Sequence, residues 1–179
     1  MKGVIFNILE EMVIEHKGME TWNNILEQVS TTDGIYTAAD SYPDEQLFDL
    51  VEEVSKQISL PMEDVIGSFG EFMFNKLASR HPIFIEQSPD LKTFLKSIES
   101  VIHVEVRKLY DQPNLPTFEY EEPNSDVLIM QYSSPRKLCV LAEGLIRGAA
   151  LHYKTNIEVG HTTCMHKGAK ACDLNIRFL

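Results

Sequence analysis

A short segment, Asp111 to Pro116, divides this sequence into two halves with different side-chain patterns. It contains two prolines, and a proline inside a helix removes a backbone hydrogen bond and clashes with the preceding turn. Before the segment, apolar residues recur every three or four positions, which is typical of helices. After it, apolar and polar residues alternate, which is typical of strands. The chain is therefore predicted to be an α+β protein that begins with helices and continues as a mixed half.

The first half is predicted to consist of amphipathic helices. Helical spacing places one helix near the N-terminus, a short one around residues 22–29 and others at about 41–57 and from Pro61. A further helix is expected to follow Asp90 and to extend to about Tyr110. It carries one apolar stripe with His103 along its edge, so His103 can face an internal cavity.

The second half is predicted to contain four strands and one more helix. The strands are expected at residues 117–121, 127–134, 157–164 and 172–178, and the last two form a hairpin that turns through Lys167 and Gly168. The helix is expected from Pro135 to about His152. Gly144 and Gly148 lie four apart on it and suggest that another element approaches closely there.

Composition limits the classes of function. A chain of 179 residues, 44% of them hydrophobic, is long enough for one domain with a substantial core. A formal net charge of -11 disfavours nucleic acid and anionic lipid as partners, because both are bound through clustered Lys and Arg. Glu10 and Glu11 interrupt the apolar start before a signal-peptide core could form, and no apolar run reaches the roughly 20 residues that span a bilayer. A cytoplasmic location without membrane insertion is expected.

A helical histidine and three polar residues on a later strand form the most informative combination. In an extended chain Tyr132, Ser134 and Arg136 project hydrogen-bond donors to one side, where they can hold carboxylates. An imidazole such as His103 can ligate a metal. Together, His103 and the three strand residues predict a ligand that is a metal complex with acid groups, and haem fits that description. Taken separately, His103 could be a surface or hydrogen-bonded core residue, and Arg136 could pair with a carboxylate on a solvated strand face.

These residues, their order, the start Met1-Lys-Gly3 and Pro116 between them resemble the haem nitric-oxide/oxygen-binding (H-NOX) family, which includes the haem domain of soluble guanylate cyclase. The resemblance covers nearly the whole chain. It implies one domain over residues 1–179, with a helical part at about 1–60, a mixed part at about 61–179 carrying a roughly four-stranded antiparallel sheet, and haem b (iron protoporphyrin IX) between them. No catalytic residue is implied.

The resemblance also assigns roles to residues. His103 would be the proximal ligand of the haem iron, Tyr132, Ser134 and Arg136 would hold the propionates, and Pro116 would pack against the porphyrin. The haem pocket would be completed by Ile5, Leu9, Leu141 and Leu145. Family members that bind oxygen stably carry a distal tyrosine where the alignment places Leu141, and some carry a tryptophan where Leu9 stands. The aliphatic pocket therefore favours nitric oxide as the ligand, with CO as a second candidate.

The family mechanism implied for this chain is a ligand-driven switch. NO bound to ferrous iron weakens the bond to His103 and frees the helix that carries it, so binding shifts the protein between two packings. The sequence has no recognisable kinase, cyclase or methyl-acceptor segment, so a separate partner is expected. For stand-alone bacterial members this partner is commonly a signalling histidine kinase or a cyclic-di-GMP enzyme.

A second metal site is predicted near the C-terminus. Cys139, His161, Cys164 and Cys172 form a suitable set for tetrahedral structural Zn²⁺. His161 and Cys164 would lie on opposite faces of a regular strand, so a β-bulge is required between them. A cross-strand disulfide, free buried thiols, or His166 in place of His161 are the alternatives.

Two other classes of function are alternatives to the sensor. One is a haem-free small-molecule-binding regulatory module with a zinc-stapled hairpin. The other is an enzyme, either a haem oxidoreductase or a zinc hydrolase. It has the least support, because three Cys and one His would close the zinc site and no distal acid or base is positioned for peroxide chemistry.

Overall fold

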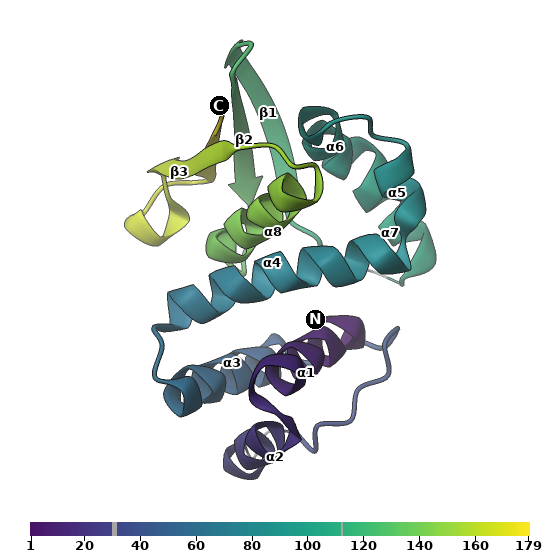
Figure 1. Ribbon diagram of the computed structural model, residues 1–179, viewed down its shortest axis with the longest axis vertical. Coiled ribbons are helices and arrows are strands. Elements are labelled where there is room, and N and C mark those ends of the chain that lie inside the picture. Colours follow the sequence, from purple (N-terminus) through teal and green to yellow (C-terminus); the bar gives the residue numbers. More distant parts are fainter. Residues whose placement is uncertain (30–31, 112) are drawn as a thin grey trace.

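The computed structural model describes residues 1–29, 32–111 and 113–179 (Figure 1). Gln112 in the segment that divides the sequence therefore lies outside the described residues. The helices of the first half are α1 (Gly3–Lys17), α2 (Met19–Gln28), α3 (Asp44–Ile58), α4 (Met62–Arg80), α5 (Pro82–Glu86), α6 (Leu91–Ser97) and α7 (His103–Leu109). Across the described ranges, none of the helices combines the length and apolar character needed to cross a bilayer.

The first three helices pack into one layer on one side of α4, and α8 (Cys139–His152) with the sheet lies on the other side (Figure 1). The helical layer forms because apolar residues of α1 recur at helical spacing and bury Phe6, Leu9 and Val13. Phe69 of α4 belongs to this same cluster, whereas Phe74 belongs to a second cluster with the sheet. The α4 helix therefore contributes to both hydrophobic cores.

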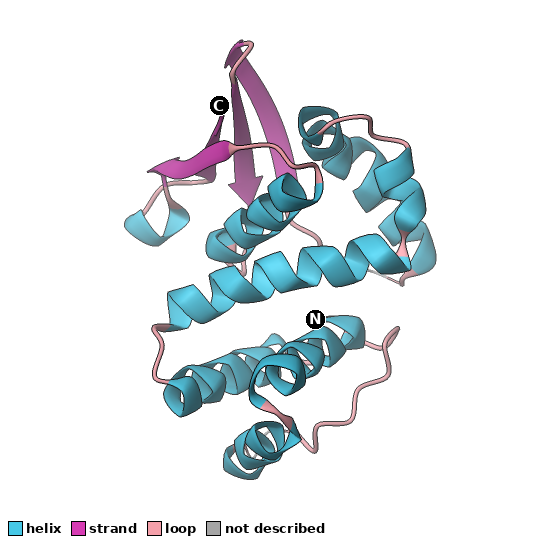
Figure 2. Cartoon of the chain, viewed as in Figure 1, coloured by secondary structure: helices cyan, strands magenta, loops and turns pink. Residues whose placement is uncertain are grey.

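The sheet has four antiparallel strands in the order β1-β2-β4-β3. The strands are coloured magenta in Figure 2. These strands are β1 (Thr117–Asn124), β2 (Val127–Ser133), β3 (Ile157–Thr163) and β4 (Cys172–Phe178). Along β4, Cys172, Leu174 and Ile176 are fully buried and alternate with more exposed residues. The predicted α+β class and the four-stranded antiparallel sheet are confirmed.

The helix α8 begins four residues later than predicted, at Cys139 instead of Pro135. Ser134 to Lys137 forms a turn in which the Lys137 amide donates to the Ser134 carbonyl at 3.1 Å. Lys137 has a φ of 51°, a left-handed conformation that is incompatible with a continuous helix. Pro135 therefore belongs to a turn, and the expectation that it starts the helix was wrong.

The helices α4 and α8 cross at glycines, as Gly144 and Gly148 predicted. A Cβ added to Gly144 would lie 2.2 Å from the Gly67 carbonyl oxygen, and one added to Gly148 would lie 2.9 Å from the Glu71 carbonyl oxygen. Because both obstructions are backbone atoms, no side-chain rotation can relieve them. The glycines thus fix how closely the two helices that join the cores approach.

Replacing Gly144 with alanine is expected to destabilise the protein by about 2 kcal/mol. Overpacking costs roughly 1–3 kcal/mol, and alanine recovers only part of this through its better helix propensity. The free energy of unfolding in urea measures the effect. Gly160→Ala is the control, because a Cβ at Gly160 of β3 meets no atom within 4 Å. Equal stability of the two variants would contradict the close approach.

The helix predicted from Asp90 to about Tyr110 is present but is interrupted by a π-helical turn, η1 (Ile98–Ile102). Asp90 caps its start, because its Oδ1 accepts a hydrogen bond from the Thr93 amide at 2.8 Å. Within the wide turn, the His103 amide donates to the Ile98 carbonyl, five residues earlier. Turns of this type are frequent at functional sites. The apolar periodicity gave no sign of it.

Candidate cofactor site and cysteine cluster

His103 is a buried histidine, 8% exposed, at the start of α7. Its Nδ1 lies 3.0 Å from Glu99 Oε2, and no described residue hydrogen-bonds its Nε2. Burial lowers the pKa of His103 below its usual value, and this effect exceeds the opposing pull of Glu99. The result is a neutral imidazole with one nitrogen oriented by a carboxylate and the other left for a ligand, which is the arrangement of a metal-bound histidine.

Glu99, within the π-helical turn, is bonded through both carboxylate oxygens. Oε1 accepts a hydrogen bond from Arg107 Nη2 at 3.0 Å, and Oε2 accepts one from the Phe118 amide at 3.2 Å in addition to its contact with His103. Burial raises the pKa of Glu99, but the hydrogen bonds from Arg107 and His103 outweigh it and the net pKa is lowered. Glu99 is therefore an ionised partner of the imidazole.

Tyr132 and Ser134 are both buried, and the Phe118 ring contacts the rings of both Tyr132 and His103. The Phe118 ring centroid lies 5.9 Å from that of His103 and 5.7 Å from that of Tyr132. The Tyr132 hydroxyl accepts a hydrogen bond from the Leu138 amide at 2.9 Å, and burial raises its pKa. The structure therefore places His103 and Tyr132 against the same phenylalanine ring. Ser134 lies one residue beyond the end of β2.

Arg136 lies beyond the end of β2, in the turn that precedes α8, so it does not share a strand face with Tyr132 as the alternation predicted. Its guanidinium holds Asp44 through two hydrogen bonds, Nε to Oδ2 at 2.5 Å and Nη2 to Oδ1 at 3.0 Å, and also donates to the Asn114 carbonyl. The Met1 amino group donates to Asp44 Oδ1 at 2.6 Å. Arg136 therefore pairs with a carboxylate, which is the alternative that the sequence leaves open.

Arg136 still has capacity for an acid group. A guanidinium has five N–H donors, and the bonds to Asp44 and Asn114 use three of them. Burial raises the pKa of Asp44, but Arg136 and the N-terminal amino group outweigh this and lower it. The pair is therefore charged on both sides, and the two remaining donors can hold a carboxylate such as a haem propionate.

The apolar residues assigned to the haem pocket belong to the hydrophobic cluster of the helical layer, between α1, α4 and α8. Leu9 is fully buried, and Ile5, Leu141 and Leu145 are half-buried and pack against the same hydrophobic cluster. Pro116 is half-buried in the segment between α7 and β1. A neutral imidazole, spare guanidinium donors and an aliphatic wall are the groups that haem requires, so the residues present fit this cofactor.

A second group of ligating atoms links the start of α8 to the C-terminal hairpin. The ligand atoms of Cys139, His161, Cys164 and Cys172 all lie within 4.8 Å of one another. Cys164 Sγ is 4.0 Å from Cys139 Sγ and 3.8 Å from Cys172 Sγ. Tetrahedral zinc with Zn–S bonds of about 2.3 Å requires sulfur atoms about 3.8 Å apart, so the spacing matches. A disulfide would need about 2.05 Å, and the thiols are free.

His161 is the imidazole of this cysteine cluster. Its Nδ1 lies 2.6 Å from Glu143 Oε1, and its Nε2 is buried with no hydrogen-bond partner. The predicted bulge is confirmed, because the register of β3 against β4 shifts between His161 and Thr163. His166 is exposed and bonds the Lys137 carbonyl through Nε2 at 2.7 Å, so the structure places His161 in the cluster instead.

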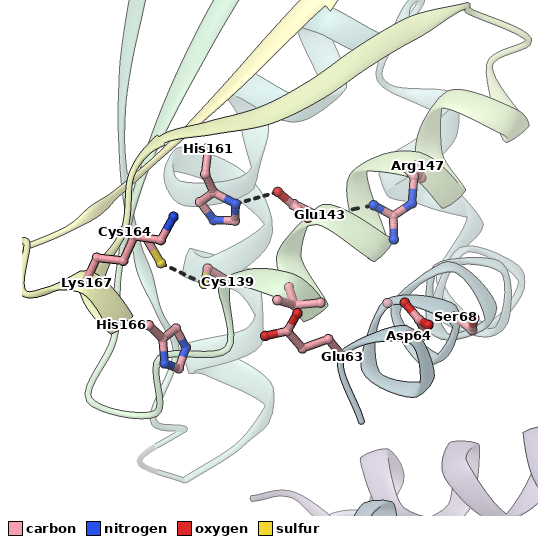
Figure 3. Close-up of a pocket in the computed structure, with 12 residues that line it drawn as sticks. Glu63, Asp64, Ser68, Cys139, Glu143, Arg147, His161, Cys164, His166 and Lys167 are labelled. Atoms are coloured by element: carbon pink, nitrogen blue, oxygen red, sulfur yellow. Dashed lines mark hydrogen bonds and ion pairs between the residues drawn. The ribbon is translucent and has the colours of Figure 1, made fainter. Parts of the chain in front are cut away.

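The cluster borders an open cavity of about 600 Å³ between α4, α8 and the hairpin (Figure 3). Charged side chains line it, among them Glu63, Asp64, Arg147 and Lys167. Burial and the neighbouring thiols raise the pKa of Cys139 to about 12. Three thiolates at this spacing repel one another, so a bound cation is what would hold them deprotonated together.

Three partners of these sites were not identified from the sequence. Glu99 and Glu143 stand four residues from His103 and Cys139 respectively, a spacing that places side chains on one helical face and could have indicated them. Asp44 lies 92 residues from Arg136, and no local pattern connects the two.

Comparison with known proteins defines the class. The Haem-NO-binding family model matches residues 2–161, so the chain belongs to the haem-NO-binding, or H-NOX, family. An H-NOX protein of Shewanella oneidensis, solved in the Fe(II)NO ligation state, is 44% identical, with a TM-score of 0.94 over 100% of this chain and 99% of that one. An H-NOX protein of K. algicida is 28% identical, with a TM-score of 0.91 over 100% of this chain and 97% of that one.

Among curated proteins, soluble guanylate cyclase gcy-32 of Caenorhabditis elegans is 26% identical over 84% of this chain. The match covers only 23% of that protein. The chain therefore has the haem gas-binding sensor fold that is related to soluble guanylate cyclase, and the match does not extend to a catalytic domain.

Proposed function

We propose that this protein is a haem-based nitric oxide sensor. The observation that carries the proposal is His103, a buried neutral imidazole with Nδ1 held by Glu99 and no described partner on Nε2. His103 would ligate the haem iron through Nε2, while Tyr132, Ser134 and Arg136 would hold the propionates. Bound haem would supply the iron to which the gas binds. A solved S. oneidensis relative carries NO on Fe(II) and another structure carries CO, which supports gas binding here.

The switch in this proposal is the release of His103. Haem held by His103 would supply the iron that binds NO, and release of the His103 imidazole would free the helical segment from α6 to α7. The layer formed by α1, α2 and α3 would then relax into a second packing. Because α4 contributes to both hydrophobic clusters, a shift on one side is transmitted to the other.

The output would pass to a separate signalling protein. We propose a histidine kinase of a two-component pathway or a cyclic-di-GMP enzyme as the partner class. The strongly acidic chain, with a net charge of -11, supports a protein partner over nucleic acid. We also propose structural zinc at Cys139, His161, Cys164 and Cys172, supported by the sulfur spacing and by the unpaired, buried Nε2 of His161.

Absorption spectra of the haem-loaded protein test the function directly. The ferrous protein is prepared without oxygen, and spectra are taken alone, with NO and then in air. A complex with NO and no stable complex with O2 would support the proposal. A protein that stays colourless after expression with ample haem would overturn it and favour a haem-free binding module.

Leu141 is the residue proposed to exclude stable oxygen binding. It is half-buried on α8 and offers no hydrogen-bond donor to polar, superoxide-like O2. We expect Leu141→Tyr to raise O2 affinity roughly 10- to 150-fold, since one hydrogen bond to a charged acceptor contributes about 1.5–3 kcal/mol. Oxygen titration of the ferrous protein measures this. Leu151→Tyr, at a position 68% exposed on the same helix, is the control. An unchanged O2 affinity in Leu141→Tyr would show that Leu141 does not face the bound gas.

A further inference from the structure

The carboxylate of Glu99 is the one acidic group in contact with His103 among the described residues. It lies in the π-helical turn directly before His103, and its side chain is 26% exposed. Three groups from different parts of the chain hydrogen-bond the Glu99 carboxylate. These are the imidazole of His103, the guanidinium of Arg107 one helical turn further, and the Phe118 amide of β1.

The geometry fixes Glu99 from two elements. The π-helical turn sets its backbone, and the Phe118 amide holds Oε2 at 3.2 Å from the side of the sheet. The Glu99 amide is also directed at the Tyr120 hydroxyl of β1, at 3.4 Å. The oxygen that faces His103 Nδ1 is therefore held in place independently of His103 itself.

The two oxygens have different roles. Oε2 receives His103 and Phe118, whereas Oε1 receives Arg107, whose side chain is 43% exposed. An arginine on the far oxygen withdraws electron density from the carboxylate and weakens its hold on the imidazole N–H. Glu99 is thus a hydrogen-bond acceptor shared between a buried imidazole and a surface guanidinium.

We propose that Glu99 is a positioning residue that strengthens the bond between His103 and the haem iron, and that Arg107 moderates its effect. The proposal rests on the proposed function. A carboxylate that accepts the outer N–H of a metal-bound histidine fixes its tautomer and makes the other nitrogen a stronger donor. Glu99 therefore stabilises the state in which His103 is bound, and so sets how readily NO releases the helix.

Two substitutions with opposite expected effects test this. Glu99→Gln retains the shape of the side chain but loses its charge, so the iron–histidine stretching band in resonance Raman spectra of the ferrous protein should move to lower frequency. Haem transfer to an excess of a haem-binding acceptor protein should become about 10-fold faster, the lower end of what such outer partners contribute. Arg107→Gln removes the competing donor from Oε1, so the same band should move to higher frequency.

The matched control is Glu105→Gln. Glu105 lies on α7, is 43% exposed and pairs with Lys108, so the substitution removes an acidic group from the same helix without touching His103. Opposite shifts for Glu99→Gln and Arg107→Gln with no shift for Glu105→Gln support the proposal, since general loosening would not raise the frequency. Bands identical to wild type in both variants would overturn it.

The failure of the proposed function gives a different result. If wild-type protein shows no iron–histidine band, or if His103→Ala retains one, then His103 is not the ligand of the haem iron. The proposed role of Glu99 is then also wrong. Should Glu99→Gln not fold, Arg107→Gln decides alone, because its exposed side chain leaves no buried gap. An upward shift then supports the proposal, and an unchanged band overturns it.

Discussion

Replacing His103 with glycine is expected to give a protein that retains haem only when imidazole is added, and that then adopts the packing of the NO-bound wild type. His103 would be the only tie between the iron and the α6–α7 segment, and free imidazole restores the ligand without restoring the tie. Without imidazole, haem retention should fall by about 100-fold or more, since even outer partners of a ligand contribute 10- to 100-fold. Backbone hydrogen exchange across residues 91–109 and α1 measures the packing.

The exchange experiment needs four samples: wild type unliganded, wild type with NO, and His103→Gly and His152→Gly with imidazole. His152 is an exposed histidine at the end of α8, so its variant controls for loss of an imidazole and for added buffer. We expect His103→Gly to match the NO-bound sample and His152→Gly to match the unliganded one. Exchange in His103→Gly equal to that of the unliganded wild type would show that release of His103 is not the switch.

Local patterns in the sequence predicted the fold where one element determines its own conformation. The alternation of β4 predicted a strand with one buried face. Gly144 and Gly148 predicted a close approach to α8, and the structure shows that the approaching element is α4. The π-helical turn before His103 was not predicted, because two of its contacts, with the Phe118 amide and the Tyr120 hydroxyl, come from a strand later in the chain. The start of α8 was misplaced for a related reason, since Pro135 is equally compatible with a turn.

In the candidate sites too, some residues were predicted from local patterns, and others depend on contacts between distant segments. His103 and Arg136 were predicted as site residues from their type and order, and the bulge after His161 followed from the need to turn two ligands to one side. Asp44 was missed because its contacts with Arg136 and with the Met1 amino group depend on how distant segments pack. Residues whose role depends on a partner nearby in the chain can be inferred, whereas those that meet only in the folded protein leave no periodic signal.

The cysteine cluster carries the second large expected effect. Cys139 lies at the first turn of α8, while Cys164 and Cys172 lie on the hairpin, so a zinc ion there would join the helix to the edge of the sheet. We expect Cys139→Ala to lower bound zinc from about one ion per chain to nearly none, because three ligands hold structural zinc poorly. The loss should destabilise the fold by on the order of 4 kcal/mol, which for this length lowers the melting temperature by about 8–16 °C.

Two histidines lie near the three cysteines, and their substitution distinguishes which one is the fourth zinc ligand. His161 has Nδ1 on Glu143 and a buried, unpaired Nε2, whereas His166 is exposed and bonds a backbone carbonyl. His161→Ala should therefore lose zinc and stability much as Cys139→Ala does, and His166→Ala should keep both. Metal analysis after dialysis and thermal unfolding measure these outcomes. Full zinc content in Cys139→Ala would show that Cys139 is not a zinc ligand. Zinc loss in His166→Ala, with zinc retained in His161→Ala, would show that His166 is the ligand instead of His161. A strong chelator should reproduce the destabilisation in wild type and leave Cys139→Ala unchanged, since only a bound ion couples these four side chains.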